Sequence, residues 1–446
     1  MTLLCVLFLL AMSACSKPSS QSAPISDSEL DVRARTFVRH MAEGKPGDAV
    51  KMMDKTMAAA MPASKVTETW QALLAQAGTF DSVSGTRLAT ESGFRCVYVT
   101  CKFSSGGVDT KVVFDAAGQV SGLWFSPSQA ETPSYKQPLY ADTLAFTETE
   151  CTIGAGQWKL PGTLSMPKGE GPFPAVVLVH GSGPNDRDET AGPNKPFKDL
   201  AWGLASKGIA VLRYEKRTKQ YQAEMATQVE TLTVSQETVE DALAAVVLLR
   251  QTKGVDPVRV FVIGHSLGAS LAPRIASEAA EGDGSIAGLV MLAPNATNIA
   301  DLIVEQVEYI ASLDGKVDDR ESAEIKRVKD DVAKVVGGQM QKGEVILGAA
   351  KAYWDDLLAY DPLETAQSLE IPLLVLQGER DYQVTMRDFN LWKDALGVKE
   401  GATLRSFPSL NHLFIQGEGK SSPAEYQNPG NVDAAVIDAI AVWVKK

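Results

Sequence analysis

The segment Gly264–Gly268 carries the residue most suited to nucleophilic chemistry in this chain, a serine between two glycines. The apolar run before it, Val258–Ile263, predicts a buried parallel strand, and the alanine-rich run after it, Ala269–Ala280, predicts a helix. The pattern G-x-S-x-G is common by chance, but between a strand and a helix it is typical of a nucleophile elbow. We therefore predict that Ser266 stands on a strained turn with its hydroxyl exposed.

A serine hydroxyl is unreactive at neutral pH unless a base removes its proton, and the chain contains four histidines. His40 lies in a helical pattern far upstream, His265 lies inside the elbow, and His180 ends an apolar run. The remaining histidine, His412, lies in a turn near the C-terminus. We therefore predict that His412 is the general base.

An acidic residue must orient the imidazole, and two acidic residues follow Ile371–Gln377, an apolar run that predicts a late core strand. Open α/β sheets place their sites beyond the carboxyl ends of their strands, where Asp381 would lie. Glu379, closer to the strand end, is the alternative, and an aspartate in a solvated turn would give the same local pattern. We assign Asp381 as the acid. The resulting order of serine, aspartate and histidine is that of α/β-hydrolases, not of chymotrypsin or subtilisin.

Acyl transfer also needs backbone N–H groups that stabilise the negative charge on the carbonyl oxygen. The N–H of Leu267, directly after the nucleophile, is one expected donor. The second should come from the glycine-rich loop after an early strand, and we assign it to Ser182. A shift by one residue, to Gly181 or Gly183, stays open at this point.

Several further segments carry a resemblance to a known family. From about Thr149 onward the chain resembles bacterial α/β-hydrolases of the esterase type, related to the dienelactone-hydrolase and prolyl-oligopeptidase branches. It departs from them at Thr218, where relatives often have glycine. The resemblance implies an α/β-hydrolase fold. The matching segments, besides the elbow, the aspartate turn and the histidine, are Leu160–Leu164 with Pro167, His180–Asp188 and Leu212–Arg217.

These observations together predict a serine hydrolase that cleaves carboxylic esters through an acyl-enzyme on Ser266. A peptidase, an acyl-amide hydrolase or a thioesterase would use the same triad and is the alternative reading. A non-catalytic binding lipoprotein is the alternative from another class, but a decayed site need not keep all three triad residues in order.

Composition limits the partners. The chain has 446 residues, 45% of them hydrophobic, which is enough for more than one domain, and a formal net charge of −12. That charge disfavours nucleic acid as a partner. The sequence shows no metal-ligand cluster, Walker loop or dinucleotide fingerprint, so we expect no metal and no cofactor, and a small-molecule ester as substrate.

The first residues predict export. The apolar run Leu3–Ala14 is too short to span a bilayer as a helix and is typical of a signal peptide. The following cysteine and the polar linker 16–26 resemble a bacterial lipoprotein signal, which implies cleavage before Cys15, lipidation of its thiol, and location in the cell envelope through a lipid anchor. Met12 and the lack of an early lysine or arginine depart from that pattern, so an ordinary secretory signal or an uncleaved anchor remains open.

The rest of the chain divides into parts. Residues 27–127 show helical patterns and then strand patterns, which predicts a small α+β domain. In its order of elements this domain resembles the small domains of the nuclear-transport-factor type that often precede such hydrolases. A proline-containing linker, 128–142, precedes the hydrolase domain, 143–446. Within that domain, residues 299–360 are helical by pattern and too long for a simple crossover, so we predict a helical cap over the site. We expect buried free thiols rather than a disulfide, because a strand would hold Cys96 and Cys101 about 16 Å apart.

Overall fold

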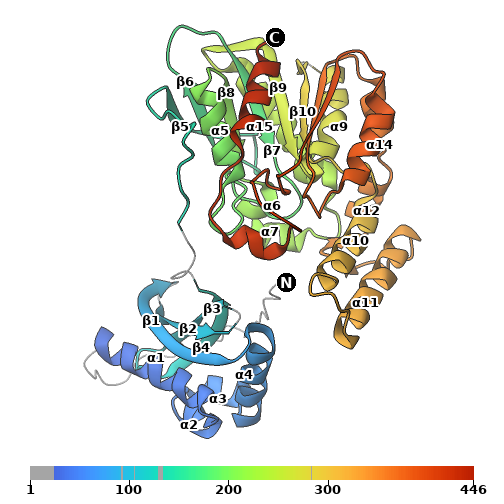
Figure 1. Ribbon diagram of the computed structural model, residues 1–446. Helices are drawn as coiled ribbons and strands as arrows, with labels where there is room; N and C mark the ends of the chain where they lie inside the picture. Colours follow the sequence, from blue (N-terminus) through green and yellow to red (C-terminus); the bar gives the residue numbers. More distant parts are fainter. Residues whose placement is uncertain (1–24, 92–93, 105, 129–133, 283) are drawn as a thin grey trace. The chain divides into compact units, whose positions relative to one another are not determined.

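The structure is a computed structural model that describes residues 25–91, 94–104, 106–128, 134–282 and 284–446. The chain forms two compact units, Met1–Thr132 and Pro133–Lys446 (Figure 1). The predicted signal peptide and its Cys15 lie outside the described residues. Within the described ranges, no helix has the length and apolar character needed to cross a membrane.

The first unit consists of four helices followed by a four-stranded antiparallel sheet in the order β1-β2-β3-β4. Its first helix begins with a capping box in which Ser26 and Glu29 satisfy each other's backbone N–H groups. The elements are α1 Asp27–Ala42, α2 Pro46–Lys51, α3 Lys55–Ala60, α4 Ala63–Ala77, β1 Phe80–Glu91, β2 Phe94–Phe103, β3 Gly106–Phe114 and β4 Val120–Pro127.

One helical pattern of this unit, 49–61, is broken in the structure. Met53 forms a β-bridge with Val120, and the Asp54 side chain then caps a new helix by accepting a hydrogen bond from the Met57 N–H. The prediction of free thiols is confirmed for the described cysteines, since Cys96 and Cys101 are both free and buried.

The second unit is built on an eight-stranded mixed sheet in the order β14-β13-β10-β9-β7-β8-β6-β5. The six strands from β14 to β8 are parallel, and β6 and β5 are antiparallel at the edge. The strands are β5 Phe146–Ile153, β6 Leu160–Pro167, β7 Phe173–Val179, β8 Ala210–Tyr214, β9 Val255–His265, β10 Leu289–Leu292, β13 Leu373–Gly378 and β14 Ala402–Phe407.

Helices cover both faces of this sheet (Figure 1). Because side chains alternate along a strand, Val177 packs with one set of helices while Val176 and Leu178 pack with the other. This arrangement confirms the predicted α/β fold class. The first set is α8 Glu240–Gln251, α9 Leu267–Glu281, α13 Pro362–Ser368 and α14 Met386–Leu396; the second is α5 Pro196–Ser206 and α15 Ala434–Val444.

The segment between β10 and β13 has a small core of its own, centred on Val328, Val332 and Trp354. Its helices lie together at one end of the sheet (Figure 1). A two-stranded hairpin within it was not predicted from the sequence. The elements are α10 Ile299–Ala311, α11 Asp319–Val336, β11 Val345–Ile346, β12 Ala349–Ala350 and α12 Lys351–Leu358.

Short helices after β8 and near the C-terminus complete the unit: α6 Arg217–Gln220, α7 Gln222–Thr227, the π-helical turn η1 Ser235–Val239, and the 3-10 turn η2 Pro423–Gln427. Part of the predicted linker 128–142 also belongs to this unit. The Tyr135 hydroxyl donates to Asp199 at 2.7 Å and the Tyr140 hydroxyl donates to the Val432 carbonyl at 2.7 Å.

Candidate active site

Ser266 occupies a sharp turn between β9 and α9. Its φ of 53° and ψ of −123° are strained values for a residue other than glycine, and α9 begins at the next residue. Both glycine positions of the motif require glycine, because neighbouring backbone atoms leave no room for a Cβ. A Cβ on Gly264 would lie 2.2 Å from the Gly268 carbonyl oxygen, and a Cβ on Gly268 would lie 2.4 Å from the carbonyl oxygens of Val179 and His180. The sequence motif thus corresponds to a real elbow.

The structure brings His412 and Asp381 together. The Nδ1 atom of His412 lies 2.6 Å from Oδ2 of Asp381, and both side chains are buried. The other carboxylate oxygen accepts the backbone N–H groups of Gln383 at 2.8 Å and Val384 at 3.0 Å, which fixes its orientation. Glu379, the alternative acid, instead accepts a hydrogen bond from the Ser406 hydroxyl on β14. The geometry therefore favours Asp381.

His265, the residue before the nucleophile in the chain, contacts the predicted general base His412. Its Nε2 donates to the His412 carbonyl oxygen at 3.0 Å, and the two imidazole rings lie 4.7 Å apart between centroids. Among the described residues, the Ser266 hydroxyl forms no hydrogen bond. Catalytic hydrogen bonds often form or tighten only when substrate is bound.

A second buried carboxylate–histidine pair, which was not predicted from the sequence, lies beside the first. The Glu189 carboxylate lies 2.9 Å from Nδ1 of His265 and accepts the Gly181 N–H at 2.7 Å. Burial is the largest single effect and lowers the pKa of His265, but the charge and hydrogen bond of Glu189, together with the His412 carbonyl and the Asp381 charge, outweigh it, so the net pKa is raised. His265 therefore serves as a support for the backbone of His412. His180 is also buried, and burial lowers its pKa to about 4, so it stays neutral.

The backbone hydrogen bonds of the structure narrow the choice of oxyanion donors. The Gly181 N–H is used by Glu189, which removes it from consideration. Within the part of the chain that the structure describes, the N–H groups of Ser182 and Leu267 have no hydrogen-bond partner. Gly181 also lies against the nucleophile, since a Cβ on it would be 3.1 Å from Cβ of Ser266. Ser182 and Leu267 stay the predicted pair that holds the carbonyl oxygen of the substrate, and Gly183, whose N–H also has no partner among the described residues, stays the alternative.

Comparison with known proteins agrees with this geometry. Residues 172–418 match a family model described as "Serine aminopeptidase, S33". Esterase EstD of Thermotoga maritima is 41% identical over 417 residues, which cover 94% of this chain and 96% of that protein. The chain belongs to this α/β-hydrolase family. Residues 34–123 match a second family model, described as a protein of unknown function.

Solved structures similar to the chain include two esterases. The Pyrobaculum calidifontis esterase is 18% identical with a TM-score of 0.44, covering 67% of this chain and 85% of that one. Est1E of Butyrivibrio proteoclasticus is 16% identical with a TM-score of 0.41, covering 67% of this chain and 99% of that one.

The elbow of this hydrolase opens into a cavity of about 510 Å³ beneath the predicted cap. Ser182 and Ser266 lie in its wall, and cap residues from α10 and α12 face them. Most of the remaining wall is apolar, which suits the hydrocarbon part of a substrate. The apolar side chains include Met225, Leu232, Leu302, Ile303, Leu357 and Val384.

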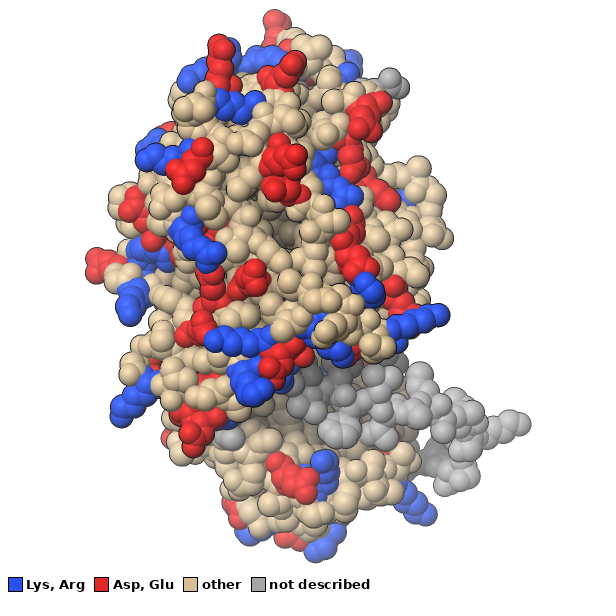
Figure 2. All heavy atoms as spheres, turned by 90° about the vertical axis from the view of Figure 1, so that its right-hand side faces the viewer, with Lys and Arg blue, Asp and Glu red and all other residues tan. Residues whose placement is uncertain are grey.

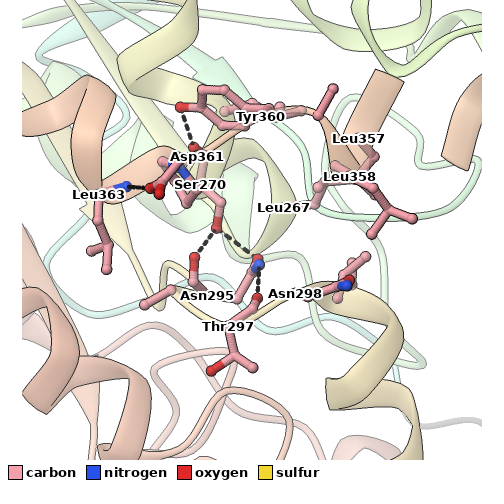
Figure 3. Close-up of a pocket in the computed structure, with 15 residues that line it drawn as sticks. Leu267, Ser270, Asn295, Thr297, Asn298, Leu357, Leu358, Tyr360, Asp361 and Leu363 are labelled. Carbon is pink, nitrogen blue, oxygen red and sulfur yellow. Dashed lines mark hydrogen bonds between the residues drawn. The ribbon is translucent and has the colours of Figure 1, made fainter. Parts of the chain in front are cut away.

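A smaller pocket of about 290 Å³ lies beside the first and shares Leu267 and Leu357 with it. Its polar side chains bond to one another (Figure 3). The Ser270 hydroxyl donates to Oδ1 of Asn295 at 2.6 Å, and the Tyr360 hydroxyl donates to the Ser270 carbonyl at 2.9 Å. These groups therefore support the wall behind the nucleophile and are not available for chemistry.

Charged side chains show no metal-binding arrangement in the described residues, where no cluster of three His, Cys, Asp or Glu side chains could hold an ion. On the face shown in Figure 2, basic and acidic side chains are interspersed. The chemistry assigned to this hydrolase uses only its own side chains and backbone.

The elbow glycine gives a direct test of the turn. Replacing Gly264 by alanine should lower the free energy of unfolding by about 3 kcal/mol, because the new Cβ meets the fixed backbone of Gly268. Displacement of the nucleophile should also lower kcat by about 10²-fold. Urea unfolding and ester turnover measure the two effects.

Gly282→Ala is the control, since the nearest atom to its new Cβ would be 4.0 Å away. This substitution should change the free energy of unfolding by less than about 0.5 kcal/mol. Equal effects of the two substitutions would contradict the assigned geometry.

Proposed function

We propose that this chain is a carboxylic ester hydrolase in which Ser266 carries the acyl group. The observation that carries the proposal is the buried His412–Asp381 pair at 2.6 Å, together with the N–H groups of Ser182 and Leu267, which have no partner among the described residues. Similarity to an esterase over nearly the whole chain supports it.

The residues define the steps. The Ser266 hydroxyl oxygen attacks the ester carbonyl carbon while its proton moves to Nε2 of His412. The carbonyl oxygen becomes negatively charged and is held by the N–H groups of Ser182 and Leu267. The carbon–oxygen bond to the alcohol then breaks, and His412 returns the proton to the leaving alkoxide. Water attacks the acyl-enzyme by the same route and releases the carboxylic acid, while Asp381 stabilises the imidazolium.

The cavity favours esters over peptides with a free amino terminus. Such peptides need an unengaged carboxylate to bind their ammonium group. Among the residues of the cavity wall, Glu237 is the single acidic side chain. Its carboxylate is already occupied by Lys216 at 3.3 Å, Thr218 at 2.7 Å and Tyr353 at 2.8 Å. The apolar wall suits an acyl chain instead.

The experiment compares matched p-nitrophenyl esters, from acetyl to dodecanoyl, with the thioesters of the same acids and with aminoacyl p-nitroanilides. We expect the highest kcat/KM for esters with a chain that fills the cavity, and little turnover of the anilides. A higher kcat/KM for aminoacyl anilides would establish the peptidase alternative.

We also propose that the hydrolase is exported and anchored in the bacterial cell envelope through a lipid on Cys15. Support comes from the sequence alone: an apolar run followed by a small residue, a cysteine and a polar linker. The anchor would keep the enzyme at a membrane surface where its ester substrates pass.

Replacing Cys15 by serine tests this anchor. The precursor expressed in a bacterial host should incorporate labelled palmitate and fractionate with membranes, and C15S should lose both properties. Replacing Cys96, which is buried in the first unit, by serine is the control and should leave the label in place. A soluble, unlabelled wild-type protein would indicate an ordinary secretory signal, and an uncleaved membrane-bound one would indicate an anchor helix.

For the first unit we propose a fold of the nuclear-transport-factor type with no catalytic part. Support comes from its order of elements, four helices followed by a four-stranded antiparallel sheet packed around one core. All the residues assigned to catalysis lie after β5.

A further inference from the structure

Lys216 is a fully buried lysine whose ammonium group touches the oxyanion loop. It follows β8, and its Nζ donates to the Gly181 carbonyl oxygen at 2.8 Å. It also lies 3.3 Å from the Glu237 carboxylate. Burying a charged pair costs desolvation free energy that the pair's attraction does not reliably offset, so a stability role alone gives weak reason for it. Its position beside the oxyanion loop suggests a second role.

The geometry of the peptide group gives that role. The carbonyl of Gly181 and the N–H of Ser182 belong to one planar, trans peptide, so they point in opposite directions. By holding the Gly181 carbonyl, Lys216 fixes the plane of this peptide and therefore the direction of the Ser182 N–H. The other end of Gly181 is also fixed, because its N–H donates to Glu189 at 2.7 Å.

The lysine is connected to the cap. The Glu237 carboxylate that holds Lys216 also accepts a hydrogen bond from the Tyr353 hydroxyl at 2.8 Å, and Tyr353 belongs to α12. Glu237 stands on the π-helical turn η1, and Thr218 donates to its other oxygen at 2.7 Å. Burial raises the pKa of Tyr353 well above its ordinary value, so its hydroxyl keeps the proton that it donates.

We propose that Lys216 is a positioning residue that aligns the Ser182 N–H for oxyanion binding, and that Tyr353 of the cap sets this alignment through Glu237. The cap then contributes to the chemical step as well as to the shape of the cavity. This inference rests on the proposed function, because it concerns the oxyanion of the same acyl transfer.

The main variant removes both charges, Lys216→Met together with Glu237→Gln, so that no unpaired charge stays buried. We expect kcat/KM for a p-nitrophenyl ester to fall by about 10- to 100-fold. This loss is smaller than that for complete removal of one oxyanion donor, because the Asn185 amide also donates to the Gly181 carbonyl and keeps part of the alignment. Tyr353→Phe is the milder variant, with an expected loss of about 3- to 10-fold for a partial misalignment of that donor. Tyr309→Phe is its matched control, because this hydroxyl of the cap helix α10 donates to the Ser421 carbonyl at 2.7 Å and lies outside this chain of contacts.

The decisive measurement is the inhibition constant of a trifluoromethyl ketone, whose adduct on the serine places an oxyanion at the oxyanion donors. It is compared with the inhibition constant of the corresponding non-fluorinated alcohol. The proposal predicts that the variants raise the inhibition constant of the ketone by the same factor by which they lower kcat/KM. The inhibition constant of the alcohol should change by less than twofold. The proposal would be overturned if the inhibition constants of both compounds rose equally. It would also be overturned if the melting temperature fell while the inhibition constant of the ketone stayed unchanged. Failure of the wild-type enzyme to form the ketone adduct would instead overturn the proposed function itself.

Discussion

Replacement of Ser266 by alanine is expected to lower kcat by a factor of about 10⁶, the scale of losing a triad nucleophile. The same change should abolish labelling by a fluorophosphonate, because that reagent forms its bond to an activated serine oxygen. Alanine removes only the hydroxyl, which makes no hydrogen bond among the described residues, so the melting temperature should stay close to that of the wild type. Steady-state kinetics, fluorescent labelling and thermal unfolding give the three measurements.

Ser270→Ala is the control, one turn further along α9. Its hydroxyl bonds to Asn295, so its loss should lower stability by about 1 kcal/mol while the protein still reacts with the fluorophosphonate. Peptide mapping of the labelled wild type should find the label on Ser266. A label on any other serine would require a different nucleophile.

Replacement of Asp381 by asparagine should lower kcat by about 10⁴-fold. The carboxylate holds the Nδ1 proton of His412 at 2.6 Å and is itself fixed by the N–H groups of Gln383 and Val384. Asparagine keeps the shape but removes the charge that stabilises the imidazolium, and it favours the wrong tautomer. The loss should be in kcat with little change in KM, measured with an ester of matched chain length.

Glu379→Gln is the matched control, since Glu379 faces Ser406 and lies two residues away in the chain. Its kcat should stay within about twofold of the wild type, the range of ordinary surface substitutions. If Glu379→Gln caused the larger loss, the acid would have to be reassigned.

The hydrolase fold could be predicted from local patterns in the sequence. The apolar run 258–263 lies within β9, and the apolar run 371–377 overlaps β13. Strands that are buried on both faces appear in the sequence as continuous hydrophobic segments. Parallel strands bring their carboxyl ends to one edge of a sheet, and that rule favoured Asp381 as the acid. Ser266 was predicted from the elbow motif, and His412 by elimination among the four histidines. The hydrolase fold is confirmed by the family match and the sheet order.

The supporting shell of the site could not be predicted in the same way. Glu189 and Lys216 are charged residues in polar segments, and such residues are usually solvated. Their burial arises from contacts with His265 and Gly181, partners far away in the sequence that only the completed fold brings close. The break of the helical pattern 49–61 has a similar origin, since the bridge from Met53 to Val120 joins distant segments.

Mass spectrometry of the enzyme quenched during turnover of a p-nitrophenyl ester tests the central claim most directly. We predict a burst of p-nitrophenol equal to the enzyme concentration and a protein mass increased by one acyl group. After digestion, that acyl group should lie on the peptide that contains Ser266. Full turnover without any acylated protein, or an acyl group on a peptide without Ser266, would contradict the account.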